Sequence, residues 1–356
     1  MGEGGQTRRP IRVLYDSRFL AHGTDAHPER PERLRRILTE LKAQGLWDEA
    51  EVAEPTPAGR EQIHLVHQPD YVRLVEQVSA GGGGYLDLDT LVTPGSYDVA
   101  LLAAGAAIQA AAIGVGERRP AFALVRPPGH HATANRGMGF CLFNSVAIAA
   151  AHAVRELGTG KVAIVDWDLH HGNGTQDAFF GRSDVLYLSV HEHPKYPGTG
   201  ARDEIGVGEG EGYTVNVPLP AGAGDDHYHR AWDEVLAPIV REFGPELLLV
   251  SAGYDAHFAD PIGGMRVTVN GFRGLAERAT ALAEETCGGR LGLVLEGGYD
   301  LPGLSRSVAA TLAALVEQGG SADEEHPPPL HASRHAQIEQ ALEMVQIVQR
   351  RLWRLD

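Results

Sequence analysis

Short apolar segments recur along the chain, and stretches long enough to form a helix separate them. The apolar segments are residues 11–15, 122–125, 162–165, 185–190, 213–217, 247–250 and 291–295. Several are apolar almost without interruption, which is typical of strands buried on both faces. Apolar residues with helical spacing occupy residues 31–46, 142–157, 226–243, 271–286 and 301–318. This alternation predicts an α/β fold in which helices cover both faces of a mainly parallel sheet.

Two further segments bear on the organisation of the chain. Residues 99–115 carry no charge and barely reach the length of a membrane span, but they consist mostly of alanine and glycine, with Gln109 in the middle. We interpret them as a buried core helix. After residue 319 the chain becomes acidic and proline-rich, and residues 335–352 then regain helical spacing. We predict a flexible N-terminus (1–10), one domain (11–318), and a linker with a C-terminal helix (319–356) that packs back or serves an oligomer.

Composition narrows the classes of function. The 356 residues are 43% hydrophobic and 22% charged, which is the usual balance of a soluble globular protein. The net charge of −16 argues against direct nucleic-acid binding and weakly favours cationic substrates. There are two cysteines and no CxxC motif, and the polar N-terminus lacks a signal-peptide pattern. We therefore expect a cytoplasmic protein that does not bind membranes.

Polar sequences follow four of the predicted strands at the point where each strand ends. They are residues 126–131, 166–173, 251–255 and 296–299. Because the carboxyl ends of parallel strands meet at one edge of a sheet, these four loops are expected to converge. The sequence therefore predicts one functional site at that edge.

The loops contain a candidate metal site. Asp168 and His170 are two residues apart, so on an extended segment both side chains point the same way, and Asp255 follows another strand. Three nitrogen and oxygen ligands leave a fourth position for water, as catalytic zinc requires. Iron(II) or cobalt would also accept this set. The simpler alternative, a hydrogen bond at a strand end, is disfavoured by His130 and His131 at a neighbouring end.

Five motifs, in this order along the chain, resemble those of the zinc-dependent histone deacetylase superfamily, which includes class II-like deacetylases and acetylpolyamine amidohydrolases. They are Arg126-Pro-Pro-Gly-His-His131, Gly139-Phe-Cys-Leu-Phe-Asn144, Val165-Asp-Trp-Asp-Leu-His-His-Gly-Asn173, Ser251-Ala-Gly-Tyr-Asp255 and Glu296-Gly-Gly-Tyr299. The resemblance covers residues 13–316, including a first loop at residues 27–33. It implies an arginase-like three-layer fold, a catalytic domain over residues 11–318, one catalytic Zn²⁺ and a narrow acyl-lysine tunnel.

The resemblance also implies roles for individual residues. His131 matches the general base and His130 its electrostatic partner. Asp166 is expected to face His130 and Asn173 to face His131. The asparagine at this position, where other relatives carry aspartate, looks like the class II branch. Tyr299 matches the tyrosine that donates to the oxyanion, which is typical of active deacetylases.

Further matches concern the substrate. Gly139, Phe140 and Tyr196 match positions that line the lysine tunnel, and Asp89 matches an acidic rim residue. Ile262 occupies the rim position where polyamine-selective relatives place an acidic residue. An apolar residue there forgoes attraction to a second ammonium group, so acyl-lysine in a protein or peptide is the expected substrate. An acetylated polyamine or another small acylated amine stays an alternative.

A structural K⁺ or Na⁺ is also implied by the resemblance. The cation site maps onto Asp166, Asp168, His170 and Ser189.

Two alternative functions fit the sequence less well. A binuclear ureohydrolase would need further aspartates close to Asp255, and the sequence there continues Ala-His-Phe-Ala before the next aspartate. An inactive acyl-lysine-binding protein is disfavoured because every residue expected for catalysis is present.

Overall fold

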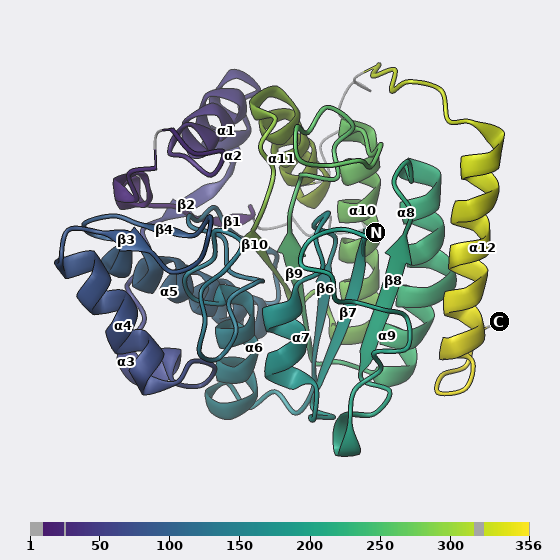
Figure 1. Cartoon of the computed structure of the whole chain (residues 1–356), viewed down its shortest axis with the longest axis horizontal. Helices are drawn as coiled ribbons and strands as arrows, with labels where there is room; N and C mark the ends of the chain where they lie inside the picture. The colour runs from purple at the N-terminus through teal and green to yellow at the C-terminus, as the bar shows by residue number, and fades with distance from the viewer. Residues whose placement is uncertain (1–9, 25, 317–323, 356) are drawn as a thin grey trace, which may run out of the picture.

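A parallel sheet of eight strands forms the centre of the computed structural model, which describes residues 10–24, 26–316 and 324–355 (Figure 1). The strand order is β2-β1-β5-β10-β9-β6-β7-β8, and every neighbouring pair is parallel. The strands are β1 (Arg12–Leu14), β2 (Glu51–Ala53), β5 (Ala121–Ala123), β6 (Val162–Asp166), β7 (Val185–Glu192), β8 (Thr214–Leu219), β9 (Leu247–Ala252) and β10 (Leu291–Leu295). All seven predicted strands are therefore present. The edge strand β2 was not predicted, because its three residues are largely exposed and lack a buried apolar run.

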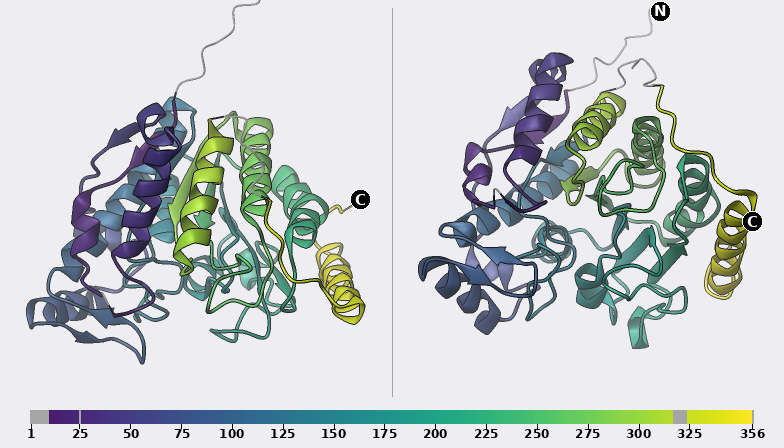
Figure 2. Two further views of the ribbon diagram at one scale, coloured as in Figure 1. Left: turned by 90° about the horizontal axis from the view of Figure 1, so that it is seen from above. Right: turned by 45° about the horizontal axis from the view of Figure 1, so that its top comes forward.

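Helices cover both faces of the sheet, as predicted. The connection from β5 to β6 through α6 (Ser145–Glu156) and the connection from β9 to β10 through α10 (Val269–Cys287) run in opposite directions along the sheet. Right-handed crossovers therefore place these helices on opposite faces. Helix α5 (Ser96–Glu117) packs beside α6, while α11 (Leu301–Leu315) packs against α10 and α1 (Glu32–Ala43) (Figure 2). The result is the expected three-layer α/β architecture.

The predicted helices are present, with three differences in detail. The helix expected over residues 31–46 ends at Ala43, because Gly45 has a φ of 74° and separates α1 from the short α2 (Leu46–Glu49). The helix expected over residues 226–243 consists of α8 (Asp225–Ala231), a π-helical turn (Trp232–Leu236) and α9 (Ala237–Phe243). Residues 317–318 of the last predicted helix lie outside the described residues.

Several elements were not predicted. They are α3 (Arg60–Ile63), α4 (Pro69–Ala80), α7 (Asn173–Phe179), the hairpin of β3 (Gly84–Tyr85) and β4 (Leu91–Val92), and 3₁₀ turns at Ser17–Ala21 and Gly208–Gly210. Except for α4, which has 12 residues, these elements are seven residues long or shorter, too short to show a periodic pattern. Along the chain, they lie in the connections between the predicted strands and helices.

The uncharged segment forms a core helix. By length and composition alone α5 could cross a membrane, but 67% of its most apolar window is buried inside the fold. It contacts β1, β5, β9 and β10 on one side and α6 on another. Its apolar surface is therefore covered by the sheet and by its neighbouring helix, as the interpretation of residues 99–115 required.

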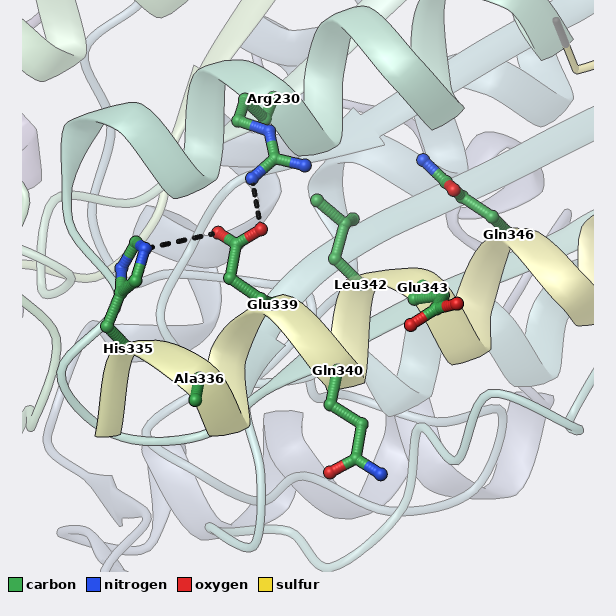
Figure 3. A pocket seen from close by; sticks show the side chains of 8 residues that line it. All are labelled: Arg230, His335, Ala336, Glu339, Gln340, Leu342, Glu343 and Gln346. Carbon is green, nitrogen blue, oxygen red and sulfur yellow. Dashed lines mark hydrogen bonds and ion pairs between the residues drawn. The ribbon is translucent and has the colours of Figure 1, made fainter. Parts of the chain in front are cut away.

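The C-terminal helix α12 (Ala332–Gln349) packs back onto the body of the protein. It lies against the edge strand β8 and α8, and buries Ile338, Leu342 and Val345. Figure 3 shows Glu339 of α12 paired with Arg230 of α8 and close to His335. The predicted flexible N-terminus, except Pro10, and residues 319–323 of the predicted linker lie outside the described residues.

Candidate active site

The four polar loops that follow β5, β6, β9 and β10 meet around one cavity of about 270 Å³. Their four strands are adjacent in the sheet, so their carboxyl ends lie side by side. From these loops the cavity is lined by His130, His131, Asp168, His170, Asp255 and Tyr299. The structure thus brings together the residues for which sequence motifs suggested metal binding and catalysis.

Asp168, His170 and Asp255 converge at the base of this cavity. Nδ1 of His170 lies 3.3 Å from Oδ1 of Asp168 and 3.0 Å from Oδ2 of Asp255. One candidate ligand atom from each residue lies within 4.8 Å of the other two, and all three side chains are buried. Two carboxylates and one imidazole in this arrangement could hold a divalent metal ion.

The local backbone explains how the three side chains meet. Strand β6 ends at Asp166, and residues 168–170 form a bend, so the expectation of an extended segment was wrong. Instead, the backbone N–H of His170 donates to Oδ1 of Asp168 at 2.9 Å, which turns both side chains toward the cavity. The N–H of Leu169 donates to Oδ1 of Asp255 at 2.7 Å and joins the two loops.

Gly297 allows the loop after β10 to approach this cluster. A Cβ atom at Gly297 would lie 2.3 Å from Oδ2 of Asp255 and 2.6 Å from Oδ2 of Asp168. The Gly297 N–H donates to the same Asp168 oxygen at 2.9 Å. Burial, together with the charge of Asp168, raises the pKa of Asp255 to about 7. A bound cation would offset this unfavourable accumulation of negative charge, so the donor set fits a metal ion.

The tandem histidines have different partners. Nδ1 of His130 lies 3.0 Å from Oδ2 of Asp166, and Nδ1 of His131 lies 2.9 Å from Oδ1 of Asn173. Burial lowers the pKa of His130, but the charges of Asp168 and Asp166 outweigh it and raise the pKa to about 10. Burial lowers the pKa of His131, and the charge of His130 lowers it further. The first imidazole is therefore suited to carry a charge, while the second is neutral and keeps a lone pair on one ring nitrogen.

Tyr299 lines the same cavity as the two histidines. Its ring stands edge-to-face with Phe140 at 5.6 Å, and the guanidinium of Arg33 lies 5.0 Å from its centroid. Its hydroxyl makes no hydrogen bond with any residue in the described ranges. Burial raises the pKa of the phenol well above its ordinary value, so the hydroxyl keeps its proton at neutral pH. This O–H group is available to donate to a ligand in the cavity.

The walls of the cavity contain the residues matched to the lysine tunnel. Gly139, Phe140, Tyr196, Ile262 and the rim residue Asp89 all line it. A Cβ atom at Gly139 would lie 2.4 Å from Cδ2 of His131 and 3.0 Å from Cε1 of Tyr196, so only glycine fits between them. These apolar walls are suited to a methylene chain.

Two of the residues matched to the monovalent cation site, Asp168 and His170, belong to the metal cluster itself, and the other two come from neighbouring strands. Asp166 and Ser189 are register partners on β6 and β7. Oδ1 of Asp166 accepts the Asp168 N–H at 3.1 Å, and the Ser189 hydroxyl lies 2.9 Å from Nδ1 of His191. The cation at this position stays a prediction.

Several residues of the site were missed by the sequence analysis. Lys195 and Pro128 line the cavity, and Glu296 accepts the N–H groups of Gly129 at 2.6 Å and His130 at 3.1 Å. Asp260 accepts the Tyr299 N–H at 2.6 Å. Glu296 opens one of the quoted motifs, which was the available signal. Asp260 and Lys195 have no local pattern that distinguishes them from ordinary loop residues.

A parallel α/β fold that carries at its strand ends a buried Asp-His-Asp triad able to hold a metal ion, two oriented imidazoles and an apolar cavity is typical of metal-dependent hydrolases. The histone deacetylase domain model matches residues 27–315 of the chain. The protein therefore belongs to the histone deacetylase family.

Individual relatives agree with this assignment. The chain is 41% identical over 295 residues to a "Probable deacetylase" of Archaeoglobus fulgidus, covering 82% of each protein. It is 40% identical to "Histone deacetylase 10, chloroplastic" of Oryza sativa, covering 94% of this chain and 80% of the relative. It is also 40% identical to the "Histone deacetylase-like amidohydrolase" of Pseudomonas aeruginosa, over 77% of this chain and 72% of that one.

A solved structure confirms the fold. The crystal structure of the HDA15 HD domain superposes with a TM-score of 0.87 at 37% sequence identity, covering 97% of this chain and 96% of that one. With the names of the relatives, this confirms the resemblance, the arginase-like α/β fold and a hydrolase that acts on amides.

Proposed function

We propose that the protein removes acetyl or other acyl groups from lysine side chains, with one catalytic zinc ion held by Asp168, His170 and Asp255. The observation that carries this proposal is the shared cavity. The triad, the two histidines and Tyr299 line one space of about 270 Å³, and Phe140, Tyr196 and Ile262 give it apolar surface as well. An extended methylene chain ending in an amide fits this distribution of polar and apolar surface.

A zinc ion in this set would supply Lewis-acid polarisation of the amide carbonyl and acidify water. The protein's own groups then move protons and stabilise charge. Asn173 accepts a hydrogen bond from Nδ1–H of His131, which leaves the lone pair on Nε2 free to take the proton of the attacking water. The same nitrogen returns a proton to the departing amine. His130, held by Asp166, contributes positive charge beside the reacting group.

Tyr299 and the walls complete the mechanism. The Tyr299 hydroxyl donates to the carbonyl oxygen as negative charge develops there, an effect typically worth about 3–4 kcal/mol for one donor. Phe140 and Tyr196 bury the methylene chain and exclude water from the reacting amide. We also propose that K⁺ or Na⁺ binds near Asp166 and Ser189, beneath the metal site.

The rim favours acyl-lysine over acetylated polyamines. Ile262 offers no charge to a second ammonium group, and Lys195 lines the same cavity with its own positive charge. Nζ of Lys195 lies 3.7 Å from Glu192, which reduces its repulsion of a cation without removing it. Among the residues that the structure describes, Asp89 is the one carboxylate outside the metal triad that lines the cavity. It keeps a small acylated amine as the second candidate substrate.

The proposal is tested with metal-stripped enzyme and two substrates, an acetyl-lysine peptide and N-acetylputrescine. Hydrolysis is measured before and after the addition of one equivalent of zinc. We expect no cleavage without metal, restored cleavage with zinc and a higher kcat/KM for the peptide. A higher kcat/KM for N-acetylputrescine would reverse the substrate assignment. Absence of cleavage of both, with zinc bound, would contradict the deacetylase proposal for acetyl groups.

A further inference from the structure

Glu325 lies in the segment that leads to α12, beyond residue 315, where the match to the deacetylase domain ends. Its side chain is only 5% exposed. Its two carboxylate oxygens each lie 3.3 Å from Nε2 of His257, and one of them accepts the N–H of Val269 at 2.8 Å. Nη2 of Arg306 lies 2.7 Å from the other oxygen. One carboxylate thus joins the loop after β9, the first residue of α10 and helix α11.

The ring of His257 connects Glu325 to the backbone of the loop after β9. Its Nδ1 accepts the backbone N–H of Ala259 at 3.3 Å, so the proton of the neutral imidazole lies on Nε2 and is donated to Glu325. The residue is almost completely buried, and a Cβ atom at Gly303 of α11 would lie 2.5 Å from Nδ1. Both ring nitrogens are therefore hydrogen-bonded, Nδ1 by the backbone of Ala259 and Nε2 by the carboxylate of Glu325.

The turn held by His257 leads directly into the active site. The Asp260 N–H donates to the carbonyl of His257 at 2.9 Å. The Asp260 carboxylate in turn accepts the N–H groups of Ile262 at 3.1 Å and Tyr299 at 2.6 Å. Residues 255–262 therefore connect a metal ligand, the rim residue and the backbone of the proposed oxyanion donor. Glu325 contacts this loop through the ring of His257.

We propose that Glu325 is a positioning residue of the active site: through His257 it fixes the loop that presents Asp255 and Ile262 and that holds Tyr299 through Asp260. This inference rests on the proposed function for the roles of those three residues. It assigns the C-terminal segment a part in the catalytic centre. Groups of this kind, one or two contacts behind a metal ligand, typically change metal affinity or activity by 10- to 100-fold when they are replaced.

The test compares Glu325→Ala with the wild-type full-length protein. We expect the backbone amides of Ala259, Asp260 and Ile262 to exchange hydrogen at least about tenfold faster in the variant, and zinc affinity, measured against a competing chelator, to fall about tenfold. With an acetyl-lysine peptide, kcat should fall while KM changes less, because the loop presents catalytic groups. Glu325→Gln keeps one acceptor oxygen and should recover part of each effect.

Two controls separate this role from general destabilisation. Glu324→Ala removes an exposed neighbouring carboxylate and should match the wild type. Glu339→Ala removes the ion pair of α12 with Arg230 (Figure 3) but leaves the contact with His257 intact, so it should not alter exchange in the loop. If Glu339→Ala reproduces the effects of Glu325→Ala, helix docking is responsible and the proposal fails. Unchanged amide exchange and zinc affinity in Glu325→Ala would also overturn it.

Failure of the inference and failure of the proposed function give different results. Amide exchange and zinc affinity are measured without substrate. If the wild type binds zinc but cleaves no acyl-lysine, the proposed function is wrong, while the exchange data still decide the role of Glu325.

Discussion

Two buried clusters of charged side chains lie at the same edge of the sheet, and their charges are balanced in opposite ways. In the guanidinium cluster, made of Glu29, Arg33 and Arg126, the carboxylate of Glu29 receives Nε and Nη2 of Arg126 at 2.6 and 2.8 Å and Nη1 of Arg33 at 3.2 Å. In the metal-site cluster, Asp168 and Asp255 share the imidazole of His170, and Nε2 of His130 lies 3.8 Å from Oδ1 of Asp168. All the charged groups of the guanidinium cluster are paired with one another, whereas the metal-site cluster has an excess of negative charge.

The pKa values follow this difference. Burial raises the pKa of Glu29, but the Arg126 charge and its hydrogen bonds dominate and lower it to about 2. Burial and the charge of Asp168 raise the pKa of Asp255 to about 7. The guanidinium cluster therefore stabilises the fold, while the metal-site cluster could hold a cation. Substitutions in the guanidinium cluster should lower the free energy of unfolding, and substitutions of the catalytic groups should lower kcat.

The largest expected effect on stability comes from Glu29→Gln. It leaves two buried guanidinium groups without their carboxylate and should lower the free energy of unfolding by about 3–5 kcal/mol. Urea denaturation measures this loss. The folded variant should retain kcat within a few-fold, because Arg33 keeps its hydrogen bonds to the carbonyl groups of Gly298 and Glu296. A loss below about 1 kcal/mol would show that the guanidinium cluster is not a major source of stability.

The same cluster predicts a dependence of stability on pH. The pKa of Glu29 is lower in the folded state than its ordinary value of 4.5, so its contribution is complete above pH 4.5 and is lost as the pH falls toward 2. The gap in unfolding free energy between the wild type and Glu29→Gln should therefore narrow over this range. A gap that stays constant would contradict the lowered pKa.

Tyr299→Phe should have the complementary effect. It removes one hydroxyl donor from the cavity and should lower kcat about 100- to 1,000-fold. The free energy of unfolding and the amount of bound zinc should change little, since the hydroxyl makes no hydrogen bond within the described structure. Steady-state kinetics, metal analysis and denaturation test the three statements. Turnover near that of the wild type would remove Tyr299 from the mechanism.

The smallest of these effects is a change in specificity at the rim. Ile262→Glu adds a carboxylate to the cavity wall and should raise kcat/KM for N-acetylputrescine about tenfold relative to an acetyl-lysine peptide, through attraction of the distal ammonium group. Ile262→Gln is a matched control of similar size without the charge and should not show the shift. Equal ratios in both variants would mean that Ile262 does not select between these substrates.

The sequence predicted the sheet and the convergence of its loops because both depend on local patterns. Largely apolar runs identified all of the inner strands, and the polar residues directly after four of them indicated one site. The short β2 lacked such a pattern. The bend at residues 168–170 depends on the hydrogen bond between His170 and Asp168, which a residue spacing of two does not reveal.

Contacts between distant segments could not be predicted. Glu325 contacts His257 across 68 residues of sequence, and Glu29 contacts Arg126 across 97. Each of these residues looks like an ordinary charged or loop residue by its neighbours alone. Their roles arise only when the fold places them together in a buried environment.

The most direct test asks whether the metal-site cluster is suited to a bound cation. It compares the free energy of unfolding of Asp255→Asn with that of the wild type, each measured without metal and with saturating zinc. The amide removes one negative charge and keeps an oxygen for the Leu169 N–H. We predict that without metal the variant is more stable than the wild type by about 1 kcal/mol or more, and that zinc reverses the order. A variant that is equally destabilised with and without zinc would contradict the view that this cluster is built for a cation.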